Sequence, residues 1–111
     1  MMRRPRVHSE KHLDFVRSLP CVVCGDPTTT EAAHIRFGFE AIGKRPVGIG
    51  EKPDDLWTVP LCSAHHRMQH QSNERNFWQA FNRDPILIAL ALWAHTGRHD
   101  VGTKIAREAG R

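Results

Sequence analysis

The sequence has no apolar run long enough to cross a bilayer. Its longest run, Ile86 to Ala94, has nine residues, against the roughly 20 that a spanning helix needs. No apolar stretch follows the basic residues 1–6, so we predict no signal peptide. Internal repeats and low-complexity segments are also absent. We therefore expect a cytoplasmic protein that does not associate with membranes.

Cysteine is scarce, histidine is not. The three cysteines are an odd number, so they cannot all pair within one chain, and eight histidines accompany them in 111 residues. In a cytoplasmic protein, Cys-x-x-Cys indicates metal or redox chemistry more often than a disulfide. The length suits one domain, residues 1–111, and is too short for two. We expect residues 1–8 and 98–111 to be flexible basic tails.

Acidic residues are outnumbered by basic ones. Sixteen Lys and Arg against twelve Asp and Glu give a net charge of +4. This balance favours a polyanionic partner, and the basic residues at both ends and in the middle of the chain suit a phosphate backbone. Many basic proteins nevertheless bind nothing specific.

The pattern of caps, prolines and apolar spacing predicts an α+β fold. A Gly-rich loop is expected over residues 38–53, because four glycines and two prolines disfavour a regular element there. We predict a first helix from Ser9 to about Leu19 and further helices that start at Ser63, after Ser72 or Asn73, and at Pro85. We also predict two strands, one that ends near residues 33–35 and one that spans residues 56–61.

The helix over Pro85 to His95 is apolar on nearly all sides. Such a helix is buried in the core or shared with another subunit. We therefore leave a monomer and a homodimer through this helix as alternatives.

Two pairs of metal-ligating residues share the same gap. Cys21-x-x-Cys24 is matched by Cys62-x-x-His65, and Cys3His is a known structural zinc set. The simpler interpretation is that the cysteines are small buried hydrophobic residues and His65 is a surface residue. The two matched pairs favour a structural Zn²⁺ ion.

The same predicted helix offers a second pair of imidazoles. His66 and His70 are four residues apart, which places them on one helical face, while His65 points about 100° away. A pair at this spacing is weak evidence by itself, but two histidines leave coordination positions open for water and substrate, as a catalytic ion requires.

A hydrolytic site also needs a base. His34 ends the first predicted strand, and an imidazole can take a proton from water near neutral pH. Arg36 would lie on the same strand face if the strand continues, where its guanidinium could hold a scissile phosphate. The alternative is a core histidine and a solvated surface charge.

These motifs together resemble the HNH, or His-Me finger, endonucleases. The residues that carry the resemblance, in chain order, are Cys21-x-x-Cys24, Ala33-His34-Ile35-Arg36, the loop Gly50-Glu51-Lys52-Pro53-Asp54-Asp55, Val59-Pro60-Leu61-Cys62, His65-His66 and His70. Within that family the sequence is most similar to the phage- and prophage-associated branch that includes the recombination enhancement function nuclease. The resemblance covers about Leu13 to Trp93.

The resemblance implies a small zinc-stapled ββα-metal core with flanking N- and C-terminal helices. It implies that His34 is the general base, that His66 and His70 bind a catalytic divalent ion, and that Asp55 supports the loop. One departure is Ala33, where many members carry a further metal ligand. Glu31, Asp54 or Asp55 could replace it.

We therefore predict a metal-dependent DNA endonuclease whose catalytic ion is Mg²⁺, Mn²⁺, Ni²⁺ or Zn²⁺. The resemblance leaves a recombinase filament open as a second partner. A zinc-stapled module that binds DNA or a recombination protein without cutting is the alternative, and Ala33 favours it. The residues expected to contact phosphates are Arg36, Lys44, Arg45, Lys52 and Arg67.

Overall fold

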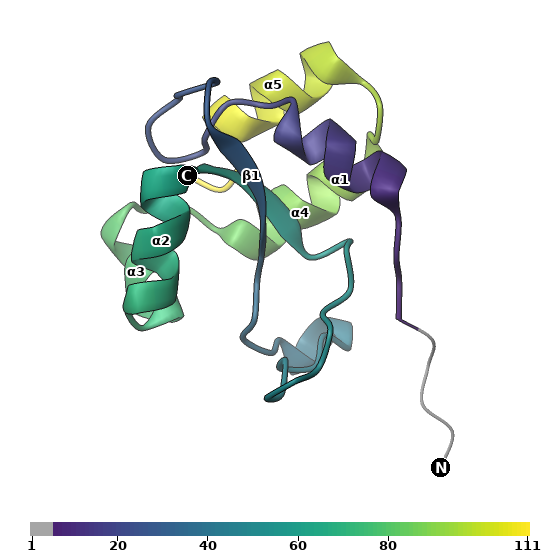
Figure 1. The fold of residues 1–111 in the computed structure, drawn as a ribbon, viewed down its shortest axis with the longest axis vertical. Helices are drawn as coiled ribbons and strands as arrows, with labels where there is room; N and C mark the ends of the chain where they lie inside the picture. The colour runs from purple at the N-terminus through teal and green to yellow at the C-terminus, as the bar shows by residue number, and fades with distance from the viewer. Residues whose placement is uncertain (1–5) are drawn as a thin grey trace.

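A computed structural model describes residues 6–111 and shows a small α+β fold. Two antiparallel strands, β1 (Thr30–His34) and β2 (Thr58–Cys62), form its centre (Figure 1). Helix α2 (Ser63–Gln71) follows β2 directly. The remaining elements are α1 (Glu10–Arg17), a short 3₁₀ helix (Glu40–Ile42), α3 (Glu74–Ala80), α4 (Pro85–Ala94) and α5 (His99–Glu108).

Local capping explains where the helices begin. The side chains of Ser9, Asn73 and Asp84 each accept a hydrogen bond from a backbone N–H in the first turn of the helix that follows. Pro85 occupies the first turn of α4, where a missing N–H costs nothing. The predicted starts of these three helices, and of α2 at Ser63, are confirmed.

The helices lie on different sides of the two-stranded sheet. Helix α1 packs against both strands, α4 against β2, and α2 against β1 and β2. In Figure 1, α2 and α3 stand to one side of the strands, away from α1, and the loop between β1 and β2 extends beyond the end of the sheet. Ala33, Val59 and Leu61 are fully buried in the core.

Helix α4 divides into a buried and an exposed face. Ile88 and Leu92 are fully buried, whereas Leu87, Leu90 and Trp93 are exposed. The buried face confirms a core role for this helix. A homodimer through residues 85–95 stays a prediction.

The expectation of a flexible tail over residues 98–111 is wrong for most of that segment. Residues 99–108 form α5, which contacts α4, and Ala106 is fully buried. The contact with α1 is close at Gly102, where an added Cβ would lie 2.7 Å from Cζ of Phe15. Small residues permit this approach, so the hydrophobic pattern alone does not reveal it.

The described part of the N-terminal segment is also held in place. Val7 N–H donates to Asp54 Oδ1 at 2.7 Å, and Ser9 N–H donates to Asp55 Oδ2 at 2.8 Å. The expectation of a flexible tail over residues 1–8 is therefore wrong for residues 6–8. Residues 1–5 lie outside the described part of the chain. Among residues 6–111, no helix is long and apolar enough to span a membrane.

Candidate metal and hydrolytic site

Cys21, Cys24, Cys62 and His65 converge beside the junction of β2 and α2. The ligand atoms of these residues all lie within 4.8 Å of one another. Cys24 Sγ is 3.8 Å from Cys62 Sγ, and His65 Nδ1 is 3.2 Å from Cys62 Sγ and 3.8 Å from Cys21 Sγ. A tetrahedral zinc ion with Zn–S near 2.3 Å and Zn–N near 2.0 Å would separate its ligands by about 3.5–3.8 Å. The cluster is therefore compatible with a zinc site.

The thiols respond differently to this environment. Burial, together with the neighbouring thiols, raises the pKa of Cys24 to about 11. At Cys21 burial alone would raise the pKa, but hydrogen bonds from the Cys62, Cys24 and Val23 backbone outweigh it and the net direction is down. Metal binding requires thiolates, so a bound cation would release the proton of Cys24.

A tight turn presents the first two cysteines. Gly25 has φ +79°, a left-handed conformation that a side chain would strain, and its N–H donates to Cys21 O at 2.8 Å. Cys21 N–H donates to Asp26 O, and Val23 N–H points to Cys21 Sγ at 3.4 Å. The spacing of two residues between the cysteines therefore follows from the turn.

The second predicted pair, His66 and His70, lies on another face of α2. Their Nε2 atoms are 3.1 Å apart, and His66 Nδ1 lies 2.7 Å from Glu31 Oε1 on β1. Two nitrogens bound to one ion at about 2.1 Å would be separated by about 3.0–3.4 Å. Histidine ligands often donate their other N–H to a carboxylate, as His66 can to Glu31. The pair therefore has the spacing of two ligands of one ion.

His34 is paired with Asp55 across the sheet end. His34 Nε2 is 3.1 Å from Asp55 Oδ1, and the His34 side chain is 26% exposed. Burial lowers the pKa of His34, and the Asp55 carboxylate offsets part of that change. His34 is therefore neutral near pH 7, with Nε2 directed at Asp55 and Nδ1 available for another partner.

Asp55 connects His34 to the N-terminal segment. The carboxylate is 2% exposed and lies 2.8 Å from His8 Nδ1 and from Ser9 N. Burial alone would raise the pKa of Asp55, but hydrogen bonds from Ser9, His34 and His8 outweigh it and lower the pKa. Asp55 thus stays ionised and fixes the start of α1 and the end of β1 together.

Glu74, which the sequence did not single out, anchors the chain after His34. Its carboxylate accepts hydrogen bonds from the N–H groups of Arg36 at 3.0 Å and Phe37 at 3.2 Å, and from Gln69 Nε2 at 2.7 Å. Gln69 Nε2 also approaches His34 O at 3.5 Å. The first residue of α3 therefore ties the exit of β1 to α2, an arrangement that sequence spacing does not indicate.

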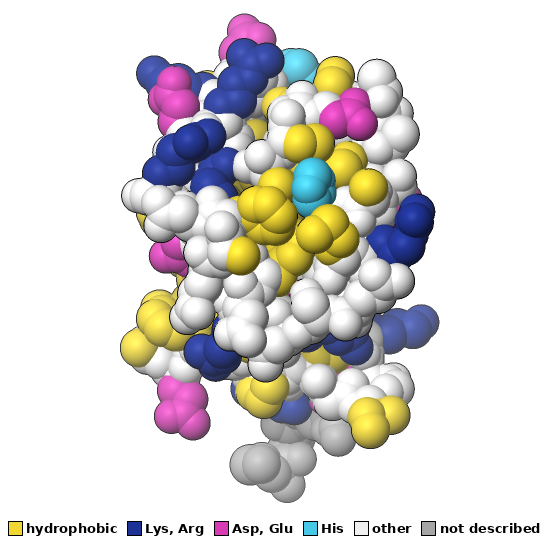
Figure 2. Space-filling view, turned by 90° about the vertical axis from the view of Figure 1, so that its left-hand side faces the viewer, with side chains coloured by type: hydrophobic (Ala, Val, Ile, Leu, Met, Phe, Trp, Pro, Cys, Tyr) yellow, Lys and Arg dark blue, Asp and Glu magenta, His cyan; other side chains and the backbone are white. Residues whose placement is uncertain are grey.

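Arg36 lies beyond the end of β1, so the condition that the strand continues to it is not met. It nevertheless lines a hollow of about 270 Å³ together with His70, Gln69 and Glu74. Arg67 is exposed on α2. Figure 2 shows the side of the molecule that carries α2 and α3, where hydrophobic side chains surround a histidine and basic side chains flank them.

Lys44 is a correction to the predicted phosphate contacts. It is 3% exposed, its Nζ donates to Phe37 O, and it lies 5.6 Å from the centre of the Trp57 ring. Burial lowers its pKa. The loop folds back on itself and covers this ammonium group, so Lys44 does not project toward solvent. Arg45 and Lys52 are exposed, as a phosphate contact requires.

Arg83 supports the cysteine turn from behind, a role that sequence reasoning missed. It is a buried residue, only 7% exposed, and its guanidinium donates to the carbonyl groups of Val22, Ala106 and Ala109. It therefore joins the turn to the end of α5. Its partners are far from it in the sequence, so a single Arg gives no local signal.

Comparison with known proteins places this chain in a family. Residues 1–94 match the family described as protein of unknown function (DUF968), and the chain belongs to that family. It is also similar to the uncharacterized protein YdfU of Escherichia coli (strain K12), with 35% identity over 68 residues. This match covers 61% of the chain and 18% of the length of YdfU. No solved structure matches.

Proposed function

We propose that this protein is a metal-dependent DNA endonuclease of the HNH type. The observation that carries the proposal is the arrangement around β1. This strand supplies His34, held by Asp55, and Glu31, which contacts the His66–His70 pair on α2. A base oriented by a carboxylate and a histidine pair backed by a carboxylate are the two parts that metal-assisted hydrolysis needs.

His34 is the general base in this proposal. Its lowered pKa keeps the imidazole neutral and able to accept a proton near pH 7. Asp55 receives N–H from Nε2, which fixes the tautomer and leaves Nδ1 to take a proton from the attacking water. As that proton is taken, the buried carboxylate stabilises the imidazolium that forms.

His66 and His70 would hold the catalytic ion, with Glu31 orienting His66. A divalent cation bound there would stabilise negative charge on the phosphate and on the leaving 3′ oxygen. Ala33 contributes no ligand, because its side chain is buried in the core. Among the acidic residues proposed to replace it, Glu31 contacts the pair, whereas Asp55 contacts His34 and Asp54 contacts Val7.

We further propose that Cys21, Cys24, Cys62 and His65 bind a structural zinc ion. Four protein ligands leave no position for a substrate. The ion would join the cysteine turn to the first turn of α2, and so fix the direction in which α2 presents His66 and His70.

DNA is the proposed substrate because the site combines anion-binding features with a net positive chain. Arg36 shares a hollow with His70, so its guanidinium can hold a phosphate next to the proposed ion. The net charge of +4 adds a nonspecific attraction for the backbone.

The test is a plasmid-nicking assay with Mn²⁺, Ni²⁺, Mg²⁺ and Zn²⁺ in turn. We expect metal-dependent nicking that falls at least ~10²-fold in His34→Ala. His95→Ala, which changes the residue at the C-terminal end of α4, should retain it. The His34→Ala protein should still bind DNA. Nicking that persists in His34→Ala after repeated purification would overturn the proposal.

The alternative is a zinc-stapled DNA-binding module that does not cut. The specific observation in its favour is Ala33, which leaves the position beside His34 without a ligand. Under this alternative, wild type and His34→Ala bind DNA equally and with the same salt dependence, and no divalent metal supports nicking.

A further inference from the structure

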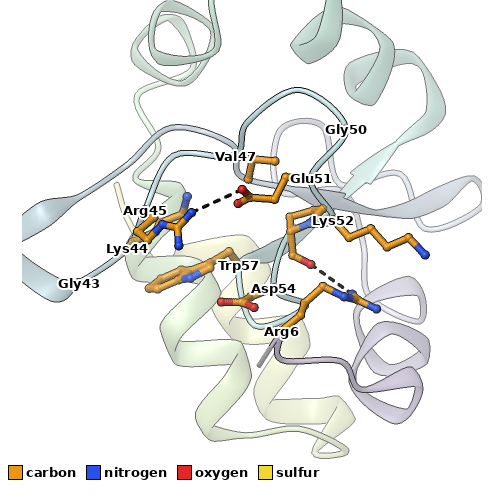
Figure 3. Close-up of a pocket in the computed structure, with 11 residues that line it drawn as sticks. Arg6, Gly43, Lys44, Arg45, Val47, Gly50, Glu51, Lys52, Asp54 and Trp57 are labelled. Atoms are coloured by element: carbon orange, nitrogen blue, oxygen red, sulfur yellow. Dashed lines mark hydrogen bonds and ion pairs between the residues drawn. The ribbon is translucent and has the colours of Figure 1, made fainter. Parts of the chain in front are cut away.

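A second hollow lies on the loop side of the sheet, apart from the one that Arg36 shares with His70. It measures about 440 Å³, within the range of small-molecule sites. Figure 3 shows Arg45 and Trp57 together on one side, Lys52 and Arg6 on the other, Glu51 above and Asp54 below. No step of the proposed hydrolysis uses this hollow.

The walls of the hollow carry more positive than negative charge. Arg6, Lys44, Arg45 and Lys52 line it against Glu51 and Asp54. Arg45 pairs with Glu51 at 3.4 Å, and Arg6 donates to Pro53 O at 3.2 Å, so both guanidinium groups are held at the rim with further N–H donors to offer. Such a rim suits a phosphate group.

The shape of the hollow favours a nucleotide over the outside of a duplex. A duplex backbone needs cations that project from a surface, whereas this site is concave. Part of Trp57 lies in its wall, with 8% of the residue exposed and Lys44 Nζ 5.6 Å from the ring centre. Bases that leave the stack are bound in such pockets, against aromatic rings or guanidinium planes. Arg45, with 67% of its side chain exposed, offers the plane of its guanidinium to such a base.

The hollow is joined to the proposed catalytic base through adjacent residues. Asp54 lines the hollow, and the next residue, Asp55, contacts His34 Nε2 at 3.1 Å. Arg6 lines the hollow and also lies 3.5 Å from Asp55 Oδ1. A nucleotide bound here would therefore bring the adjacent nucleotides of the same DNA strand close to His34.

We propose that this hollow binds one unpaired nucleotide of a DNA strand, so that the protein selects DNA with a single-stranded or distorted segment over continuous duplex. The phosphate would lie between Arg6 and Lys52, and the base would lie against the Arg45 guanidinium beside the exposed part of Trp57. The inference rests on the proposed function for its substrate, but the binding site can be tested without cleavage.

The test measures binding by fluorescence anisotropy in the His34→Ala background, with no added divalent metal. The two probes are a labelled DNA duplex with one unpaired nucleotide and the same duplex fully paired. We expect about tenfold tighter binding of the first probe, since stacking of one base has roughly that effect. Arg45→Ala and Lys52→Ala should abolish most of this ratio. Lys104→Ala, which removes one exposed charge on α5, should preserve it.

Circular dichroism would verify that each variant is folded. Equal binding of the two probes by the reference protein, or a ratio unchanged in both Arg45→Ala and Lys52→Ala, would overturn the proposal. Thymidine 5′-monophosphate that displaces the probe at the same concentration as the unlabelled oligonucleotide would assign the hollow to a free nucleotide and overturn the proposal. Tighter binding of an RNA probe with the same unpaired nucleotide would exclude the assignment to DNA.

The two proposals fail separately. A selective binding ratio without nicking by wild type in any metal would retain the nucleotide site and reject the nuclease. Metal-dependent nicking that requires His34, combined with equal binding of both probes, would retain the nuclease and reject the nucleotide site.

Discussion

The Nε2 atom of His34 lies 3.1 Å from Oδ1 of Asp55, a residue 21 positions further along the chain. This contact joins the end of β1 to the end of the long loop between the two strands. It also fixes the orientation of the imidazole ring, because Nε2 points at the carboxylate. Asp55 is held in turn by Ser9 and His8. The orientation of the proposed base thus depends on the start of α1 as well as on the sheet.

The first prediction concerns Asp55→Asn. Asp55 accepts hydrogen bonds with both oxygens, whereas an asparagine has one acceptor oxygen and presents an NH₂ group to the remaining partner. Because the carboxylate raises the pKa of His34, we expect the variant to lower that pKa further and to reduce nicking by ~10²-fold. An NMR titration of the histidine ring measures the pKa independently of activity.

The matched control is His8→Ala, which removes another partner of the same carboxylate. His8 is 55% exposed and does not contact His34 in the described structure. We expect a smaller effect on activity than in Asp55→Asn. A His34 pKa that is unchanged in Asp55→Asn would show that the two side chains are not coupled.

The second prediction concerns the Cys3His cluster. We expect about one tightly bound zinc per chain, and loss of this ion in Cys24→Ser. Since zinc binding supplies ~10 kcal/mol or more to comparable small domains, the variant should lose at least ~15 °C in Tm. Elemental analysis and thermal unfolding measure the two effects. His66→Ala should keep the tightly bound zinc, so equal zinc loss in both variants would contradict two separate sites.

Much of the local structure could be predicted from short-range signals. Ser9, Asn73 and Asp84 cap the helices that follow them, and these residues identify the helix starts directly. The gap of two residues within the Cys21–Cys24 pair and within the Cys62–His65 pair is likewise local, and the equal gaps identified the two pairs as ligands of one site. Such features depend on residues a few positions apart, so the sequence displays them.

The remaining features depend on contacts between distant residues. Glu74 binds the backbone at Arg36, 38 residues earlier, and nothing in the sequence around either position indicates the contact. Lys44 is buried because the loop folds its side chain over Trp57. A lysine in a Gly-rich segment is ordinarily exposed, so its composition predicted the opposite. Whether the His66–His70 pair binds an ion stays a prediction.

The third prediction concerns pH and His12, which is fully buried in α1. Its Nδ1 lies 2.7 Å from Thr96 Oγ1, and its ring packs edge-on against Trp93. Burial lowers the pKa of His12 below 6.5, although Asp55 opposes the shift. The unfolded chain therefore binds this proton more readily. Its contribution to stability is present above pH 6.5 and is lost as pH falls toward the folded-state pKa.

We therefore expect the free energy of unfolding to fall between about pH 7.5 and about pH 5, and to fall less in His12→Asn. Urea unfolding at the two pH values measures both. His99→Asn, which removes an exposed histidine, should retain the wild-type change. Protonation of the Cys3His ligands affects all three proteins alike, so an identical change in wild type and His12→Asn would reject the role of His12.

The last prediction tests how firmly α5 is attached to the rest of the fold. A Cβ at Gly102 would lie 2.7 Å from Cζ of Phe15, which is in α1, and 3.0 Å from Cδ2 of Leu19, just after α1, and both are core residues. Leucine has a higher helix propensity than glycine by ~1 kcal/mol, so Gly102→Leu would stabilise a helix that stands free. Against a packed neighbour the added side chain forces α5 away, and we expect a net loss of about 2 kcal/mol. Lys104→Leu, on the exposed face of α5, should change stability by less than about 0.5 kcal/mol. Chemical denaturation of both variants distinguishes a packed α5 from a free one. A Gly102→Leu protein as stable as wild type would mean that α5 does not pack closely against α1.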